Sequence, residues 1–318
     1  MGRENDLIVA THGRGAWILD DASVIQELAT AAAKPAHLFG MRTATRFVTK
    51  QAKGSLGDAL FRGPNPAYGA IIRYHLASAP AAGTAAKVDI LDAGGAVIRT
   101  IPRIPVAAGI NTMSWDLTHD GARPRRAPAP GESVPGGDDE EFGGGSGGPR
   151  ALPGRYTVRL TVGSTVLEQP VQLRVDPTSK STPEGLAAQF ALAKELRALQ
   201  SLANDTLRAL DTRRGELEAR RRGALALPNN EGAAAVVTLS ADITQLDSLV
   251  TTLAKPANYP YWSEGPRVSE RIGNLLRNVD SGNFPPTALQ QALSKELAVE
   301  LRAAMERVRQ FLSRQIMM

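Results

Sequence analysis

Apolar residues recur along this chain with two different periods. Residues 156–162 alternate apolar and polar side chains, which is the pattern of a β-strand with one buried and one solvated face. From Pro183 onward, apolar residues recur every three or four positions, which is the pattern of amphipathic helices. The sequence therefore predicts a multidomain protein in which a β part precedes an α part.

Residues 6–21 have the pattern of a β-hairpin. Leu7–Val9 and Ala16–Leu19 are short apolar runs, and Gly13 and Gly15 between them can adopt positive φ in a turn. An isolated two-stranded hairpin is only marginally stable in water. We therefore expect these strands to have paired with others that this sequence does not contain. A short helix is predicted over 22–33, ending before Pro35.

Residues 67–177 predict about seven short strands separated by turns, which favours an immunoglobulin-like β-sandwich. The expected strands are 70–76, 86–91, 96–101, 109–117, 154–162, 164–168 and 171–175. Residues 34–66 are expected to form a linker with short extended pieces at 36–39 and 45–48 and a loop over 51–66. Residues 119–150 are rich in proline, glycine and acids, which predicts a mobile, disordered insertion between two strands.

Four amphipathic helices are predicted within 181–318, and together they favour an antiparallel four-helix bundle. The first has a cap at Ser181–Thr182 and runs to about Arg222. The second and third cover 239–253 and 268–279, and Thr287–Gln290 resembles a capping box that starts the fourth. The first and last helices are expected to be the longest.

Two segments resemble known proteins. The hairpin at 6–21 resembles the last blade of bacterial sortilin-like propeller proteins, which carry neuraminidase-type repeats and are often labelled glycosyl hydrolases. Val88–Arg99 followed by Gly109–Asp116 is similar to the sandwich module of flagellar hook-capping proteins, and sortilin-like proteins carry a similar module after the propeller. In that module, the resemblance implies, the Asp92–Gly94 turn sets the strand register and Trp115 closes one end of the core.

The resemblance implies that this chain is the C-terminal part of such a protein. Its regions would be a remnant of the last propeller blade with a short helix (1–33), a linker (34–66), an immunoglobulin-like module (67–177) and a helical domain (181–318). The parent family is expected to be exported to the periplasm or the cell exterior. No signal peptide is expected in this chain, so its own compartment stays open.

Composition narrows the possible partners and chemistry. The 37 basic and 32 acidic residues are spread evenly along the 318-residue chain, so the net charge of +5 predicts no nucleic-acid-binding surface. The absence of cysteine excludes disulfides, cysteine zinc sites and thiol nucleophiles. No apolar run in the sequence is long enough to predict a membrane span.

The residues favour no catalytic, cofactor-binding or metal site. His12, His37, His75 and His119 are not spaced as a helical metal pair. Asp20 and Asp21 would point to opposite faces of a strand, so we expect them to end the strand and cap the next helix instead of acting as a glycosidase pair. The Asp-box of neuraminidase-type repeats, the nucleophile elbow and the phosphate-binding loop do not occur in the sequence.

Two further clusters have structural interpretations. Arg213–Arg214 and Arg220–Arg222 are interleaved with Glu216 and Glu218, which favours a solvated helix end over a nucleic-acid patch. The aromatic segment Asn258–Ser263 is expected to cap the helical domain, although a carbohydrate-contacting platform is the alternative.

These observations predict a non-catalytic accessory region that docks on, or extends, a sortilin-like propeller. The expected partner is the missing propeller domain or another protein. One alternative is an adhesin-like or surface-assembly module that binds by strand addition. A weaker alternative is a hydrolase with a site between the sandwich and the bundle, using Asp116, His119 and Tyr261.

Overall fold

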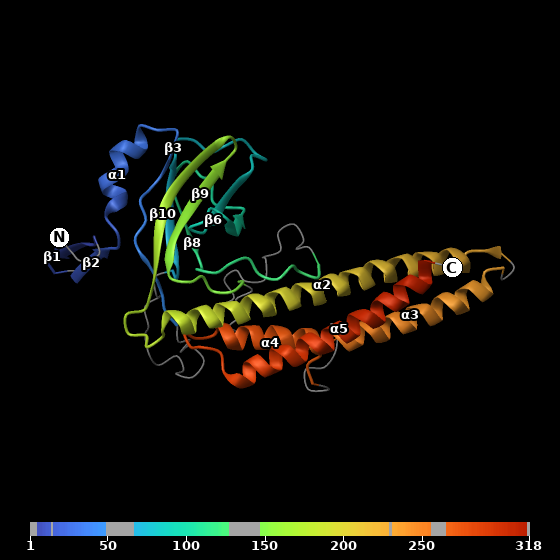
Figure 1. Cartoon of the computed structure of the whole chain (residues 1–318). Helices are drawn as coiled ribbons and strands as arrows, with labels where there is room; N and C mark the ends of the chain where they lie inside the picture. The colour runs from blue at the N-terminus through green and yellow to red at the C-terminus, as the bar shows by residue number, and fades with distance from the viewer. Residues whose placement is uncertain are drawn as a thin grey trace. The chain divides into compact units, whose positions relative to one another are not determined.

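The computed structural model describes residues 5–13, 15–48, 67–126, 147–228, 231–255 and 265–316. The chain divides into two compact units: a β unit formed by 1–120 and 150–180, and a helical unit formed by 121–149 and 181–318. The described residues form five helices and three sheets (Figure 1). The predicted combination of a β part with an α part is therefore confirmed. The expected loop at 51–66 lies outside the described residues.

The β unit contains all three sheets. β1 (Leu7–Thr11) and β2 (Gly15–Leu19) form a two-stranded sheet by themselves. A five-stranded sheet has the order β4-β10-β9-β6-β7, and a three-stranded sheet has the order β3-β5-β8. The remaining strands are β3 (Ala36–Leu38), β4 (Ala44–Arg46), β5 (Ala70–Leu76), β6 (Ala86–Leu91), β7 (Val97–Pro102), β8 (Gly109–Trp115), β9 (Gly154–Val162) and β10 (Thr165–Val175).

One apolar core joins the larger two sheets. Alternate residues of β5 and β9 are buried, as the period-two pattern predicts, and Ile72 and Val158 are both fully buried in this core. Trp115, at the end of β8, is also fully buried. Its indole nitrogen donates a hydrogen bond of 2.8 Å to the Thr118 carbonyl, and its ring meets Tyr156 edge-on at 5.3 Å. Trp115 therefore has the core position that the resemblance implied.

The turn between β6 and β7 also forms as expected. The Asp92 carboxylate accepts hydrogen bonds of 2.9 Å from the backbone nitrogens of Gly94 and Ala96. Gly95 has a φ of 82°, a conformation that glycine adopts without strain. Asp92 thereby holds the turn that aligns the two strands.

Two details of the strand pattern differ from the sequence prediction. The pieces expected in a linker form β3 and β4, which pair with β5 and β10. The two strands expected at 164–168 and 171–175 are the single strand β10, which continues through Pro170. A proline is tolerated where one side of a strand lacks a neighbour, and β4 pairs with β10 only over Leu173–Val175.

The helices begin and end close to the predicted positions. The predicted helix at 22–33 is α1 (Ser23–Ala32), in the β unit. The helical unit contains α2 (Pro183–Leu225), α3 (Ala233–Leu253), α4 (Val268–Asp280) and α5 (Ala288–Ile316). With 43 and 29 residues, α2 and α5 are the longest described helices, as expected. Leucines of α2, α3, α4 and α5, among them Leu210, Leu246, Leu275 and Leu301, share one apolar core.

Both predicted caps are present. The Thr182 hydroxyl accepts a hydrogen bond of 3.1 Å from Gly185 at the start of α2. Thr287 and Gln290 form a reciprocal capping box: the Gln290 side chain accepts from the Thr287 nitrogen at 2.8 Å, and the Thr287 hydroxyl accepts from the Gln290 nitrogen at 3.2 Å. These bonds satisfy backbone donors that a helix start leaves unpaired.

Within the described part of the chain, one helix, α3, is long and apolar enough to cross a membrane by length and composition alone. A single helix of this kind is weak evidence for a span. Leu239, Leu246 and Leu253 of α3 belong to the core of the helical unit. This agrees with the expectation that the chain has no membrane span.

The buried hydroxyl of Tyr74 should make the β unit less stable as the pH rises above 10. Its side chain is fully buried, its hydroxyl donates a hydrogen bond to the Pro105 carbonyl, and burial raises its pKa to about 12. The unfolded chain loses this proton near pH 10, so the stabilisation is complete below pH 10 and is lost as the pH rises toward 12, by up to about 1.4 kcal/mol per pH unit. Urea unfolding between pH 9 and 11.5 should show a steeper decline for the natural chain than for Tyr74→Phe. Parallel curves would contradict this assignment.

Candidate functional site

The β1–β2 hairpin exposes apolar side chains on both of its faces. Leu7 pairs with Leu19 and Val9 with Trp17 on one face, while Ile8 pairs with Ile18 on the other. All ten strand residues are exposed, with Trp17 at 66%, Ile8 at 65% and Ile18 at 63%. Neither edge pairs with another described strand, as Figure 1 shows.

Such a hairpin is a candidate interaction surface. Contiguous exposed apolar surface and unpaired strand edges both favour association with another sheet or chain. The predicted hairpin is therefore confirmed, and no other described strand pairs with it. Gly13 and Gly15 have φ values of 79° and 90°, as the predicted turn requires.

Two carboxylates hold the base of the hairpin. Asp6, just before β1, accepts hydrogen bonds of 3.0 Å from the Asp21 backbone nitrogen and from the Arg42 guanidinium. Asp21, just after β2, is only 7% exposed and accepts from the Arg73 guanidinium of β5 at 2.9 Å. These contacts join both ends of the hairpin to the strands behind it, so the hairpin is anchored although its faces are uncovered.

Asp21 also connects the hairpin to α1. Its carboxylate accepts hydrogen bonds from the Ser23 nitrogen at 3.3 Å and from the Ser23 hydroxyl at 2.5 Å, at the first residue of the helix. Its φ is 64°, a conformation that aspartate tolerates better than most residues. The predicted role of this pair in ending the strand and capping the helix is thus confirmed for Asp21, while Asp20 is exposed.

The fold brings together two of the four histidines. His37 of β3 lies directly opposite His75 of β5, and the His37 Nε2 atom is 2.8 Å from the Glu27 carboxylate. His12 lies in the exposed hairpin turn, and His119 follows β8. Across the described residues, no group of three histidine or acidic side chains has the arrangement of a metal site.

Asp116 belongs to a turn. Its carboxylate accepts hydrogen bonds from the Thr118 nitrogen at 3.2 Å and from the Thr118 hydroxyl at 2.7 Å, and it lies 3.5 Å from the Arg99 guanidinium. These contacts give Asp116 a structural role in this turn. Tyr261 and the aromatic segment Asn258–Ser263 lie outside the described residues.

The arginines between positions 213 and 222 of α2 fall into two groups. Arg213 pairs with Glu216 at 2.7 Å, and Arg214 pairs with Asp247 of α3 at 3.0 Å. Arg220–Arg222 lie near the helix end at Leu225 and make no ion pair with any described residue. The predicted position at a helix end is confirmed for this second group.

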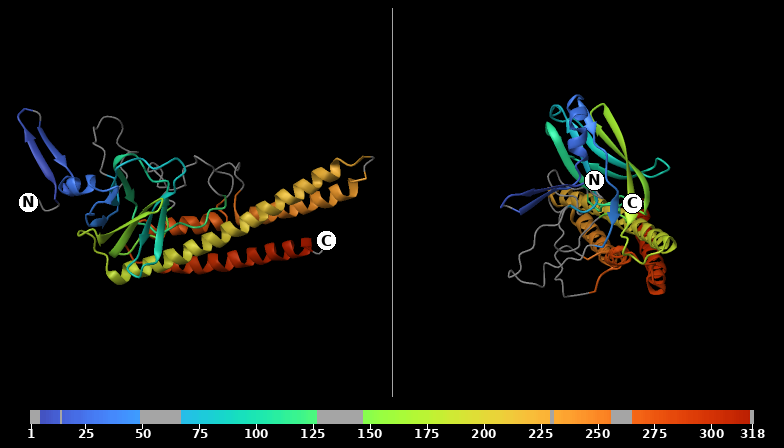
Figure 2. Two further views of the ribbon diagram at one scale, coloured as in Figure 1. Left: turned by 90° about the horizontal axis from the view of Figure 1, so that it is seen from above. Right: turned by 90° about the vertical axis from the view of Figure 1, so that its left-hand side faces the viewer.

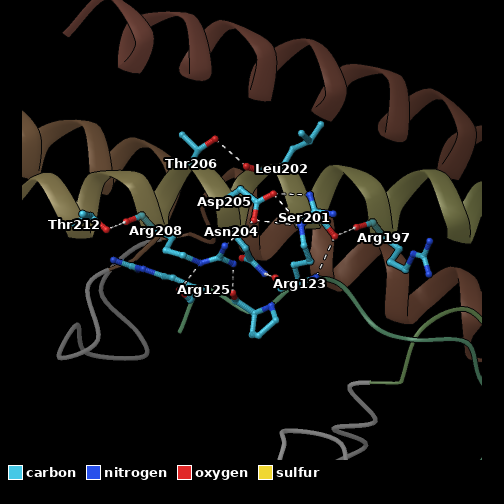
Figure 3. Close-up of polar contacts among 11 residues, drawn as sticks. Arg123, Arg125, Arg197, Ser201, Leu202, Asn204, Asp205, Thr206, Arg208 and Thr212 are labelled. Atoms are coloured by element: carbon cyan, nitrogen blue, oxygen red, sulfur yellow. Dashed lines mark hydrogen bonds and ion pairs between the residues drawn. The ribbon is translucent and has the colours of Figure 1, made fainter. Parts of the chain in front are cut away.

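A polar cluster that the sequence did not predict lies along α2, where residues 121–126 follow the helix (Figure 3). Arg123 binds the Asp205 carboxylate through Nε at 3.0 Å and Nη2 at 2.5 Å. Arg125 binds Asp211 in the same two-pronged way, at 2.7 and 2.6 Å. The hydrogen bond from Arg123 holds the pKa of Asp205 below its usual value.

Backbone contacts complete the attachment of this segment. Asn204 donates to the Arg123 carbonyl at 2.7 Å, and Arg208 donates to the Pro124 carbonyl at 2.5 Å. The Ser201 hydroxyl accepts from the Arg123 nitrogen at 3.1 Å. Part of the predicted mobile insertion at 119–150 is therefore held by specific contacts. The sequence offered one signal for this attachment. Arg123 and Arg125 lie two residues apart in an extended segment, and Asp205 and Asp211 lie six residues apart on a helix, so the two pairs have opposite charge.

Neither a scan of protein-family models nor searches of curated proteins and of solved structures finds a match for this chain.

Loss of the Asp21 carboxylate should destabilise the β unit. We expect Asp21→Ala to cost about 2–4 kcal/mol, because the Arg73 guanidinium loses its partner and alanine is strained at this φ. The adjacent Asp20→Ala is the matched control and should change stability by less than about 0.5 kcal/mol. Urea unfolding followed by tryptophan fluorescence measures both, and equal effects would contradict the anchoring role.

Loss of the two aspartates on α2 should release residues 121–126. Trypsin should cleave after Arg125 and Arg126 roughly five- to tenfold faster in Asp205→Asn/Asp211→Asn than in the natural chain, since two ion pairs are removed. Glu231→Gln/Asp242→Asn makes the same change in charge in the same unit and should leave the cleavage rate unchanged. An unchanged rate in the first variant would show that the ion pairs do not hold the segment.

Proposed function

We propose that this chain is a non-catalytic accessory region that docks on, or extends, a sortilin-like β-propeller. The observation that carries the proposal is the β1–β2 hairpin, which is apolar and exposed on both faces and whose two outer edges pair with no other described strand. A propeller blade would cover both faces of the hairpin, because each blade packs between two neighbouring blades. It would also pair the strand edges, because the strands of a blade form a larger sheet.

In this proposal the β unit is an immunoglobulin-like sandwich and the helical unit is an antiparallel four-helix bundle. The shared core of the five-stranded and three-stranded sheets supports the first assignment. The shared core of α2, α3, α4 and α5 supports the second. Both units then extend the propeller and position it relative to other structures.

Ligand binding or hydrolysis, where the parent protein performs it, belongs in this proposal to the propeller. Asp116 is held in a turn by Thr118, and the described residues contain no three-residue metal group. The hydrolase alternative that used Asp116, His119 and Tyr261 has no supporting observation among the described residues.

One observation favours the second candidate, an adhesin-like or surface-assembly module. The free edges of β1 and β2 could each accept an extended strand from another chain by main-chain hydrogen bonds. In that case the apolar faces would be covered by copies of the same hairpin or by a different partner, and not by a propeller.

A co-purification experiment separates the two candidates. The full chain is expressed with a sortilin-like propeller whose last blade lacks its final two strands, and separately with the intact propeller. We expect binding to the truncated propeller only, because only it has a vacant place for the hairpin. The triple variant Ile8→Thr/Trp17→Thr/Ile18→Thr should bind at least about a hundredfold more weakly, since three large apolar contacts are lost.

The matched control is Val97→Thr/Ile110→Thr/Val166→Thr, which removes three exposed apolar side chains from other strands of the same unit. It should bind as the natural chain does. Equal binding to both propellers, or to neither, would refute the docking proposal. Self-association by light scattering that disappears in the hairpin variant would establish the surface-assembly module instead.

A further inference from the structure

The turn between α2 and α3 carries a second uncovered apolar surface. In the helical unit these two helices extend past the end of α5, so the other helices do not cover their connection (Figure 1 and Figure 2). At this tip, Leu225 is 60% exposed, Leu227 49% and Val237 71%. We call these three residues the apolar tip.

The apolar tip is a compact structure. Gly232 approaches the end of α2 so closely that a Cβ atom there would lie 1.9 Å from the Ala224 carbonyl oxygen. The Ala226 and Leu227 nitrogens donate back to the carbonyls of Arg222 and Ala224, at 3.2 and 3.4 Å. A shallow hollow of about 210 Å³ lies among Ala224, Leu225, Leu227, Gly232, Ala233 and Val236. These contacts hold the end of α2 directly against Gly232 at the start of α3.

The start of α3 prolongs this apolar surface. Residues 233–241 contain no charged side chain. The one threonine among them, Thr238, donates its hydroxyl to the Ala234 carbonyl at 3.2 Å, so its polar group is satisfied within the helix. Burial of this end of α3 in a less polar medium would therefore leave no hydroxyl donor unpaired at Thr238.

Arg220, Arg221 and Arg222 follow one another just behind the tip; Arg220 and Arg222 are exposed, and Arg221 is half-buried. Consecutive residues of a helix are about 100° apart, so the three side chains spread around the α2 axis as a collar. They precede Leu225 by three to five residues, which is about 4.5–7.5 Å along the axis. None of the three makes an ion pair with a described residue, whereas Arg213 and Arg214 on the same helix do.

We infer that the α2–α3 tip docks end-on onto the surface of a bilayer that contains anionic phospholipids. The apolar tip enters the boundary between headgroups and acyl chains, and the collar of arginines lies at the depth of the phosphate groups. Arginine suits this position because its planar guanidinium binds phosphate with two hydrogen bonds.

Charge and composition favour lipid over the other anionic partners. Glu231 is the one acid in the described part of the turn, so the three arginines leave a net positive charge there. The tip has no aromatic side chain on which nucleic-acid bases could stack. A collar around a helix end suits a planar surface met end-on, whereas a partner lying along the helix would need its charges on one face.

The inference is independent of the propeller proposal, because the tip and the hairpin lie in different units. It also requires no membrane-spanning helix. The contact is peripheral, and it combines an apolar insertion with a basic cluster, the two signals that together give stable attachment.

Co-sedimentation with vesicles tests the inference. The full chain is mixed with vesicles of 30% phosphatidylglycerol and 70% phosphatidylcholine, or of phosphatidylcholine alone. We expect binding to the anionic vesicles that high salt reverses. Each arginine removed should weaken binding about fivefold, so Arg220→Gln/Arg221→Gln/Arg222→Gln should lose it by about a hundredfold.

Two controls isolate the tip. Arg155→Gln/Arg302→Gln/Arg307→Gln makes the same change in net charge at exposed positions elsewhere and should lose less than a few-fold. Leu225→Ser/Leu227→Ser/Val237→Ser keeps the arginines and should also lose binding, because insertion is half of the contact. Circular dichroism of every variant verifies that the helices remain folded.

The absence of natural cysteine allows a direct depth measurement. An environment-sensitive fluorophore attached to Leu227→Cys should shift to shorter wavelength with anionic vesicles, while the same fluorophore at Ala292→Cys, an exposed residue near the start of α5, should not. Four results would overturn the inference: no vesicle binding, equal binding to neutral vesicles, binding that survives the arginine changes, and an unshifted fluorophore at Leu227. Self-association through the tip without vesicles would point to a second copy of this chain as the occupant.

Discussion

The apolar core shared by the two larger sheets is the interaction on which the β unit depends. Ile72 of β5 and Val158 of β9 meet in this core, and Trp115 is buried in it through packing and an indole hydrogen bond. The opposite faces of these strands are then free to carry polar side chains. Arg73, on the outer side of β5, anchors Asp21 and through it the hairpin and α1. The hairpin is thus positioned by β5, whose inner face lies in the core, although no residue of the hairpin belongs to that core.

Among the described residues, the β1–β2 hairpin and the α2–α3 tip are both uncovered apolar surfaces, and their surroundings differ. The β1–β2 hairpin has apolar side chains on both faces and offers strand edges, which suit the strands of another sheet. The α2–α3 tip offers no strand edge and is followed by a collar of arginines. The partners that we propose for the two surfaces therefore differ in chemistry, because the polar groups beside each surface determine what can cover it.

The ion pairs described above mainly fix the positions of chain segments relative to the helices and strands that they contact. The two-pronged contacts of Arg123 and Arg125 attach an extended segment to α2, and the Asp21–Arg73 pair fixes the base of the hairpin. The exposed pairs of Arg123 and Arg125 add little free energy, but their geometry is specific. Arg220–Arg222 make no such ion pair with a described residue, unlike Arg213 and Arg214 on the same helix.

The sequence by itself determined the type and the approximate bounds of the helices, the hairpin with its turn, the Asp92 turn and the Thr287 capping box. These features depend on neighbours within a few residues, so periodicity and capping residues are enough to predict them. Only the tertiary structure decided that 36–38 and 44–46 are strands of the sheets, that His37 faces His75, and that Arg123 and Arg125 bind Asp205 and Asp211. Each of these depends on register or packing between residues far apart in the chain, for which the local pattern of apolar and polar residues carries no signal.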